Sequence, residues 1–166
     1  MNHFDAKQLY QQFFDMVYRI CFLYMKQESD ACDMAQETFL RLLKNKPQFD
    51  SEEKAKAWLI VTASNCCKTQ LSKWWRSRRE VYDEEIMMAV NPEETEANRE
   101  IRELVWSLEK KYSVPMYLYY FEGYKIHEIS KMLRIKESTI QTRLARAREL
   151  LKLELDSVCE MEGGMQ

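Results

Sequence analysis

The chain has very little glycine and proline, three residues of each among 166. Long periodic segments with so few breakers favour an all-α fold over other classes. No stretch of about eighteen apolar residues occurs, so a membrane-spanning helix and direct membrane insertion are not expected. The first seven residues also lack the basic and apolar regions of a secretory signal, which predicts a cytoplasmic protein.

Metal-ligating and catalytic patterns are missing as well. Two histidines and an odd number of cysteines, without a C-x-x-C pair, leave no zinc-ligand spacing and predict reduced thiols. His127-Glu128 resembles the start of a metalloprotease helix, but Lys131 stands where the second histidine is needed. Because a glycine-rich phosphate loop is absent too, we expect no enzymatic activity, no catalytic residue, no metal and no cofactor. The cysteines are Cys21, Cys32, Cys66, Cys67 and Cys159.

Charge is distributed in blocks, although the net charge is only -2. Residues 55–79 contain six bases and no acid, and residues 134–152 contain six bases and two acids. Between them, residues 80–103 contain nine acids and two bases. Two basic blocks separated by an acidic one predict two nucleic-acid-binding surfaces joined by a polar connector.

The expected architecture is therefore two small helical domains joined by an acidic linker. We place the first domain at residues 1–80, the linker at 81–96, the second domain at 97–158 and a tail at 159–166, which we expect to be disordered from Glu160.

Helix start signals place three helices in the first domain and several in the second. The first three should begin near Asp5, at a Ser29-Asp30 N-cap and near Ser51, the last continuing to about Arg79. The second domain should contain a helix to Tyr112, another opened by Ser113-Val114-Pro115, and then a helix-turn-helix.

Residues 122–148 carry the helix-turn-helix pattern of a short helix, a three-residue break and a longer basic helix. Apolar residues recur at helical spacing in both helices: Ile126, Ile129, Met132 and Leu133 in the first, and Ile140, Leu144, Ala147 and Leu151 in the second. The opposite face of the second helix carries Ser138, Thr142, Ala145, Arg146 and Glu149, mostly short side chains suited to base edges and phosphates. We expect Gln141, Thr142 and Arg146 to read bases, and Ser138, Thr139 and Arg143 to lie nearer the DNA backbone.

A second candidate surface follows the helix expected over residues 58–76. Its stripe, at steps of three and four, is Trp58, Thr62, Asn65, Thr69, Ser72 and Arg76. An aromatic ring, an amide, hydroxyls and a terminal cation suit single-stranded DNA. Trp58 fits the hydrophobic core equally well, and a solvated face is the alternative for the others. We favour DNA contact for Asn65, Lys68 and Arg76.

Three motifs in this order resemble those of bacterial sigma factors. Residues 30–42, DACDMAQETFLRL, resemble the signature helix that docks on core RNA polymerase. Ala57-Trp58-Leu59 followed by Ala63-Ser64-Asn65 resembles the promoter-melting helix, and the helix-turn-helix resembles the domain that reads the upstream, minus-thirty-five element. The size and the two-domain layout are similar to the extracytoplasmic-function (ECF) subgroup, over nearly the whole chain.

This resemblance implies a sigma factor that directs core RNA polymerase to specific promoters and melts them. It implies as partners core RNA polymerase, through the β′ coiled coil and the β flap, and promoter DNA, and an anti-sigma factor is common in the family. The residues implied for the β′ coiled coil are Asp33, Gln36, Glu37 and Arg41, which by themselves would indicate only a solvated helix face. Those implied for the melted minus-ten element are Phe49, Asp50, Ser51, Trp58, Thr62, Asn65, Lys68 and Arg76.

The helix-turn-helix departs from the family pattern at three positions. Ser130 stands at the expected small residue, and Arg134 replaces the turn glycine, which costs about 1 kcal/mol if a left-handed residue is required. Lys136 replaces the usual Ser or Thr cap and leaves Glu137 to favour the positive helix end.

Two other functions are compatible with parts of the pattern. An autonomous helix-turn-helix repressor or activator would bind a palindrome as a dimer, but it gives no role to the stripe over residues 58–76. A helical interaction protein that does not bind DNA leaves the basic blocks unexplained.

Overall fold

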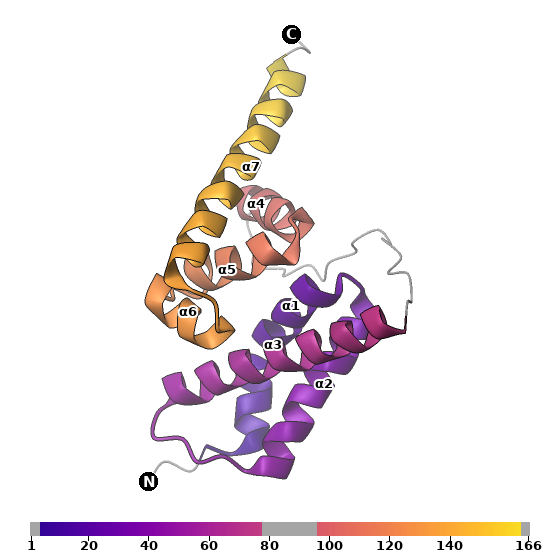
Figure 1. Ribbon diagram of the computed structural model, residues 1–166, viewed down its shortest axis with the longest axis vertical. Coiled ribbons are helices and arrows are strands. Elements are labelled where there is room, and N and C mark those ends of the chain that lie inside the picture. The colour runs from indigo at the N-terminus through magenta and orange to yellow at the C-terminus, as the bar shows by residue number, and fades with distance from the viewer. Residues whose placement is uncertain (1–3, 78–95, 164–166) are drawn as a thin grey trace. The chain divides into compact units, whose positions relative to one another are not determined.

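The computed structural model describes residues 4–77 and 96–163, and these form seven α-helices and no strand (Figure 1). The helices are α1 (Ala6–Met25), α2 (Glu28–Asn45), α3 (Glu52–Arg76), α4 (Glu96–Ser107), α5 (Lys110–Tyr120), α6 (Ile126–Leu133) and α7 (Glu137–Gly163). They group into two compact units, α1–α3 and α4–α7. The expected all-α class is confirmed. The predicted linker lies, apart from Glu96, outside the described residues.

The first unit is a three-helix bundle in which each helix packs against the other two. Large side chains such as Ile20, Leu23 and Leu59 are fully buried, and each contributes about 1.5–3 kcal/mol of hydrophobic stabilisation. Small buried side chains on α2 and α3 let the helices approach closely. These are Ala31, Ala35, Ala55 and Ala63.

Two helix starts of this unit test the sequence signals. The expected helix start near Ser51 is confirmed, because α3 begins at Glu52 and Ser51 is its N-cap, with Oγ accepting a hydrogen bond from the backbone N–H of Lys54 at 3.2 Å. The expected N-cap at Ser29-Asp30 is wrong, since α2 begins at Glu28 and its N-cap is Gln27, with φ -132° and ψ 138°. Acidic Glu28 and Asp30 lie instead in the first turn, where they favour the positive end of the helix.

In the second unit α5 packs against α4, α6 and α7. The expected helix start at Ser113-Val114-Pro115 is wrong, because α5 begins at Lys110 and Pro115 lies inside it. A proline inside a helix loses one backbone hydrogen bond. Here residues 113–118 are all buried, so tertiary packing outweighs the local signal.

The C-terminal end of the second unit also differs from expectation. Helix α7 continues to Gly163, so disorder is not found over residues 160–163, where it was expected. Residues 164–166 lie outside the described residues. Glu160, Met161 and Glu162 are good helix formers, and the first breaker is Gly163. Within the described helices, none is long and apolar enough to cross a membrane.

Candidate nucleic-acid interface

Helices α6 and α7 form a helix-turn-helix whose inner face is buried. Ile129 and Leu133 of α6 are buried, as are Ile140, Leu144 and Ala147 of α7. The expected apolar faces are thus confirmed at their centres, while Ile126, Met132 and Leu151 at their edges are half-buried. Since α7 packs on both α5 and α6, its outer face has a set orientation within the unit.

The turn between the two helices is closed around Ser130. Its backbone oxygen accepts hydrogen bonds from the N–H groups of Arg134 and Ile135, the latter at 3.1 Å, and its Oγ donates to the backbone oxygen of Ile135 at 2.5 Å. Arg134 is left-handed, with φ 57° and ψ 46°. The turn therefore does require the conformation that favours glycine, and the serine at position 130 supplies an extra hydrogen bond.

The outer face of α7 carries the predicted base-reading residues. Ser138, Gln141, Thr142, Ala145 and Arg146 are exposed, and Thr139 and Arg143 are half-buried. Thr142 Oγ1 donates to the backbone oxygen of Ser138 at 2.9 Å, which leaves its lone pairs to accept. Arg146 Nη1 lies 3.0 Å from Glu149 Oε2. Both side chains of this pair are about half exposed, so the pair is weak and does not fix the Arg146 side chain.

The stripe on α3 is only partly exposed. Thr69, Ser72, Arg76 and the neighbouring Lys68 are exposed, and Trp58 and Asn65 are half-buried. Thr62 is buried, which does not favour its predicted contact with DNA, and that contact stays a prediction. Because α3 packs against both α1 and α2, its buried sector is wider than that of a helix covered on one side.

The loop before α3 gives two of its predicted residues local structural roles. Asp50 Oδ2 lies 2.8 Å from Lys54 Nζ, and this hydrogen bond lowers the pKa of the exposed carboxyl. Ser51 is the N-cap of α3. Phe49 and Trp58 contact each other edge to face, with ring centroids 6.0 Å apart, so the loop is held against the helix by an aromatic pair.

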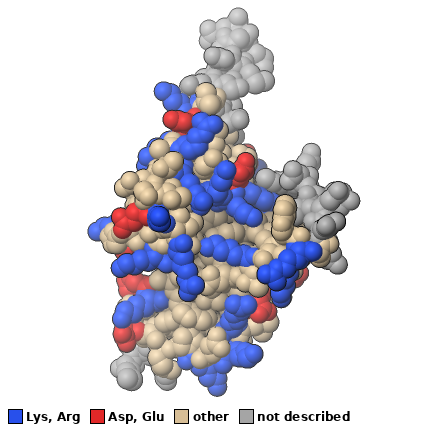
Figure 2. All heavy atoms as spheres, in the orientation of Figure 1, with Lys and Arg blue, Asp and Glu red and all other residues tan. Residues whose placement is uncertain are grey.

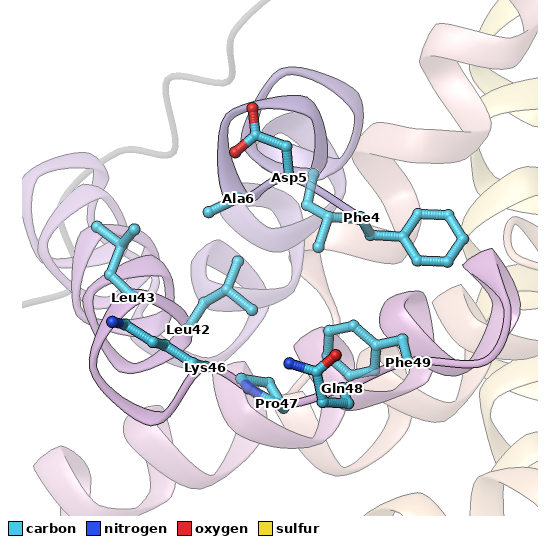
Figure 3. A pocket seen from close by; sticks show the side chains of 10 residues that line it. Phe4, Asp5, Ala6, Leu42, Leu43, Lys46, Pro47, Gln48 and Phe49 are labelled. Carbon is cyan, nitrogen blue, oxygen red and sulfur yellow. The ribbon is translucent and has the colours of Figure 1, made fainter. Parts of the chain in front are cut away.

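A pocket of about 390 Å³ opens beside Phe49, between the start of α1 and the end of α2 (Figure 3). Figure 3 shows the rings of Phe4 and Phe49 on the same side of it, with the Gln48 amide next to Phe49. Its wall is largely apolar, including Leu9, Leu42 and Pro47. Sequence reasoning missed Phe4, Lys46 and Gln48, because the pocket joins segments about forty residues apart. The one signal was that Lys46 and Gln48 are close to Phe49 in the loop.

Trp75 at the end of α3 was also missed. Trp75 is 86% exposed, and in the sequence it lies between the basic residues Lys73 and Arg76. Lys and Arg side chains outnumber Asp and Glu on the face of the molecule seen in Figure 2. An exposed ring among cations is typical of surfaces that stack on nucleobases and track a phosphate backbone.

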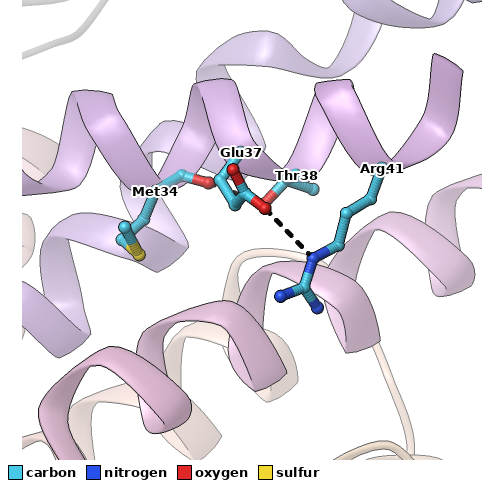
Figure 4. A network of polar contacts seen from close by, with 4 residues as sticks. All are labelled: Met34, Glu37, Thr38 and Arg41. Carbon is cyan, nitrogen blue, oxygen red and sulfur yellow. Dashed lines mark hydrogen bonds and ion pairs between the residues drawn. The ribbon is translucent and has the colours of Figure 1, made fainter. Parts of the chain in front are cut away.

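On α2 the predicted polar residues form an exposed or half-buried strip, and two exposed leucines lie beside them. Asp33 and Gln36 are exposed, and half-buried Glu37 and Arg41 pair at 3.4 Å between Oε1 and Nε (Figure 4). Thr38, which is buried, donates through Oγ1 to the backbone oxygen of Met34 at 2.8 Å. Leu40 and Leu43, exposed by 58% and 56%, were missed, because apolar residues are normally expected to face inward.

The fold and these surfaces define a two-unit, helix-turn-helix DNA-binding protein, and comparison with known proteins agrees. Residues 9–78 match the family model described as Sigma-70 region 2, and residues 98–151 match Sigma-70, region 4. The ECF RNA polymerase sigma factor SigW of Bacillus subtilis (strain 168) is 28% identical over 85% of this chain and 83% of its own. RNA polymerase sigma factor SigV of the same strain is 28% identical over 83% of each chain.

A solved structure has the same fold. The sigma factor RpoE from Bartonella quintana, in complex with the anti-sigma factor NepR, superposes with a TM-score of 0.73. The sequence identity is 18%, and the match covers 90% of this chain and 96% of that one. The chain belongs to the ECF group of the sigma-70 family and directs RNA polymerase to promoters.

Proposed function

We propose that this sigma factor divides promoter recognition between its two units. The first unit, residues 1–80, binds core RNA polymerase and holds the melted minus-ten element. The second, residues 97–158, reads the minus-thirty-five element as duplex DNA. The observation that carries the proposal is the two-sided α7, with Ile140 and Leu144 buried and Thr142 and Arg146 exposed opposite them.

In the second unit α7 is the reading helix. Its exposed hydroxyls, amide and guanidinium provide both donors and acceptors for base edges in the major groove. Gln141, Thr142 and Arg146 contact bases. Ser138, Thr139 and Arg143 lie beside the DNA backbone, and the methyl group of Ala145 lies against a thymine methyl. The unit also contacts the β flap of the polymerase.

In the first unit the melted strand runs from the Phe49 loop along α3. The pocket beside Phe49 is large enough for a nucleobase, and Gln48 places an amide at its edge. Asn65 and Lys68 continue the path, and exposed Arg76 and Trp75 end it with a cation and a stacking ring. Asp50 and Ser51 shape the loop by accepting hydrogen bonds from Lys54. They contact the melted DNA strand only by accepting further hydrogen bonds with their side-chain oxygen atoms.

The exposed strip on α2 is the surface for the β′ coiled coil. Asp33, Glu37 and Leu40 recur at steps of four and three and so share one helix face. Polar groups around an exposed leucine are typical of an interface with an apolar centre and a polar rim. By analogy with the NepR complex of the Bartonella quintana protein, an anti-sigma factor is a further partner of this chain.

Charge reversal of Asp33 combined with Leu40→Ser is expected to lower the affinity for core polymerase by about 1–3 kcal/mol, through loss of steering charge and apolar contact. The fold should be unaffected, since both side chains are already exposed. Titration of labelled core polymerase measures the affinity, with charge reversal of exposed Asp15 on α1 as the matched control. Unchanged affinity of the double variant would exclude this face.

The proposed function as a whole is tested by run-off transcription. Core polymerase with this chain should initiate at promoters selected from a random library, and core polymerase alone should not. An autonomous repressor would instead bind palindromic duplexes without polymerase and support no transcript.

A further inference from the structure

The turn between α6 and α7 contains Arg134 at a position that favours glycine. Arg134 has φ 57° and is exposed, and this conformation is strained for any residue with a Cβ atom. The turn after α5 shows the usual solution, because Gly123 occupies the left-handed position there with φ 74°. Strain that is retained at one position points to a function for the side chain.

The turn gives Arg134 no freedom to relax. Its N–H and that of Ile135 both bond to the backbone oxygen of Ser130, and Ser130 Oγ bonds back to Ile135. The preceding Leu133 is buried. These contacts hold the backbone left-handed, and the Arg134 side chain is exposed to solvent.

The charges around the turn form a small cationic group. Lys131 on α6, Arg134 in the turn and Lys136 directly before α7 are all exposed, and Glu137 follows as one acid. The backbone N–H groups at the start of α7 add positive potential. In a helix-turn-helix the start of the second helix reaches base edges while the first helix crosses the DNA backbone. The turn that joins the two helices therefore lies near both the groove and the phosphates.

We propose that Arg134, flanked by Lys131 and Lys136, binds a phosphate of the DNA backbone beside the upstream element, and that the strained turn is retained for this contact. The contact carries no base preference. The inference rests on the proposed role of α7 and adds a residue outside its reading face.

A purely structural role is the competing explanation. The other non-glycine residues with positive φ among residues 4–77 and 96–163 are Lys26 and Lys46, which are also basic and end α1 and α2. A cation at a helix C-terminus is favourable by itself. Lys26→Gly therefore serves as the matched control, since it removes the same charge and strain from the first unit.

The test uses full-length variants assembled with core polymerase, bound to promoter duplexes over a range of salt concentrations. Arg134→Gly removes charge and strain, whereas Arg134→Gln removes charge alone. Both should bind about three- to tenfold more weakly at every promoter sequence, with the salt slope smaller by about 0.9, the share of one phosphate contact. Amide hydrogen exchange in α6 should slow by about two- to fivefold in Arg134→Gly only, because the turn is relaxed.

Each outcome decides the matter. If both variants keep the wild-type affinity and salt slope, Arg134 only ends α6 and binds no phosphate. An equal loss of affinity in Lys26→Gly would lead to the same conclusion. Normal binding by Arg134→Gln with weak binding by Arg134→Gly would assign the effect to backbone flexibility and overturn the phosphate contact. If the wild-type assembly itself shows no selective promoter binding, the proposed function fails, and this inference with it.

Discussion

Asn65→Ala is expected to form the closed promoter complex normally and to open it about tenfold to a hundredfold less, a loss of about 1–3 kcal/mol. Melting requires unpaired bases to be held better than paired ones, so the protein must offer contacts that only the open strand can use. Asn65 lies half-buried on α3, next to exposed Lys68 and away from the fully buried Leu59 and Ala63. Upstream contacts by α7 are untouched, and the closed complex should therefore persist. Permanganate footprinting of the melted segment, beside a gel-shift measurement of the closed complex, separates the two steps.

The control for this experiment is a template already mismatched over the melted segment. Pre-opened DNA should largely rescue Asn65→Ala, because the energy of strand separation no longer has to come from the protein. Gln70→Ala is the matched variant, since Gln70 is another half-buried amide of α3 but lies off the stripe, and it should open duplex promoters normally. Equal defects on mismatched and duplex templates would instead assign Asn65 to folding or to polymerase docking.

Arg146→Ala is expected to weaken binding to the upstream element by about 1–3 kcal/mol and to relax base preference at one or two positions. The guanidinium can donate two parallel hydrogen bonds to a guanine edge, which alanine cannot replace. In the free protein the guanidinium pairs with Glu149 at 3.0 Å, and both side chains are about half exposed. Little energy is therefore needed to release Arg146 from this pair. Selection from a randomised upstream element, followed by affinity measurement, gives both quantities.

Two variants on α7 distinguish base reading from charge. Glu149→Ala should leave binding unchanged or improve it, because Arg146 loses only a weak competitor. Arg143→Ala should weaken all sequences alike and flatten the salt dependence, as expected of a phosphate contact. Recovery of the wild-type consensus with Arg146→Ala would show that Arg146 does not read a base.

The helix-turn-helix was predictable because its information is local. The spacing of Ile140, Leu144 and Ala147 dictates which face of α7 is buried, and the residues opposite follow at 100° per residue. The same reasoning did not predict the burial of Thr62, which a helix covered on one side would expose but which α3 buries between two neighbours. It also failed at Pro115, where a strong local breaker was overruled by the burial of the whole segment.

The sequence alone determined the helical class, the separation of two basic blocks and the turn at Arg134. It also determined the polar faces of the helices expected over residues 30–44 and 137–151. Each depends on residues within a few turns of one another. Tertiary structure alone decided that Phe4 and Phe49 line one pocket, that Trp75 and Leu40 face solvent, and that Phe49 packs on Trp58. These depend on how helices pack, and packing is governed by summed contacts between segments distant in the chain, which no local periodicity encodes.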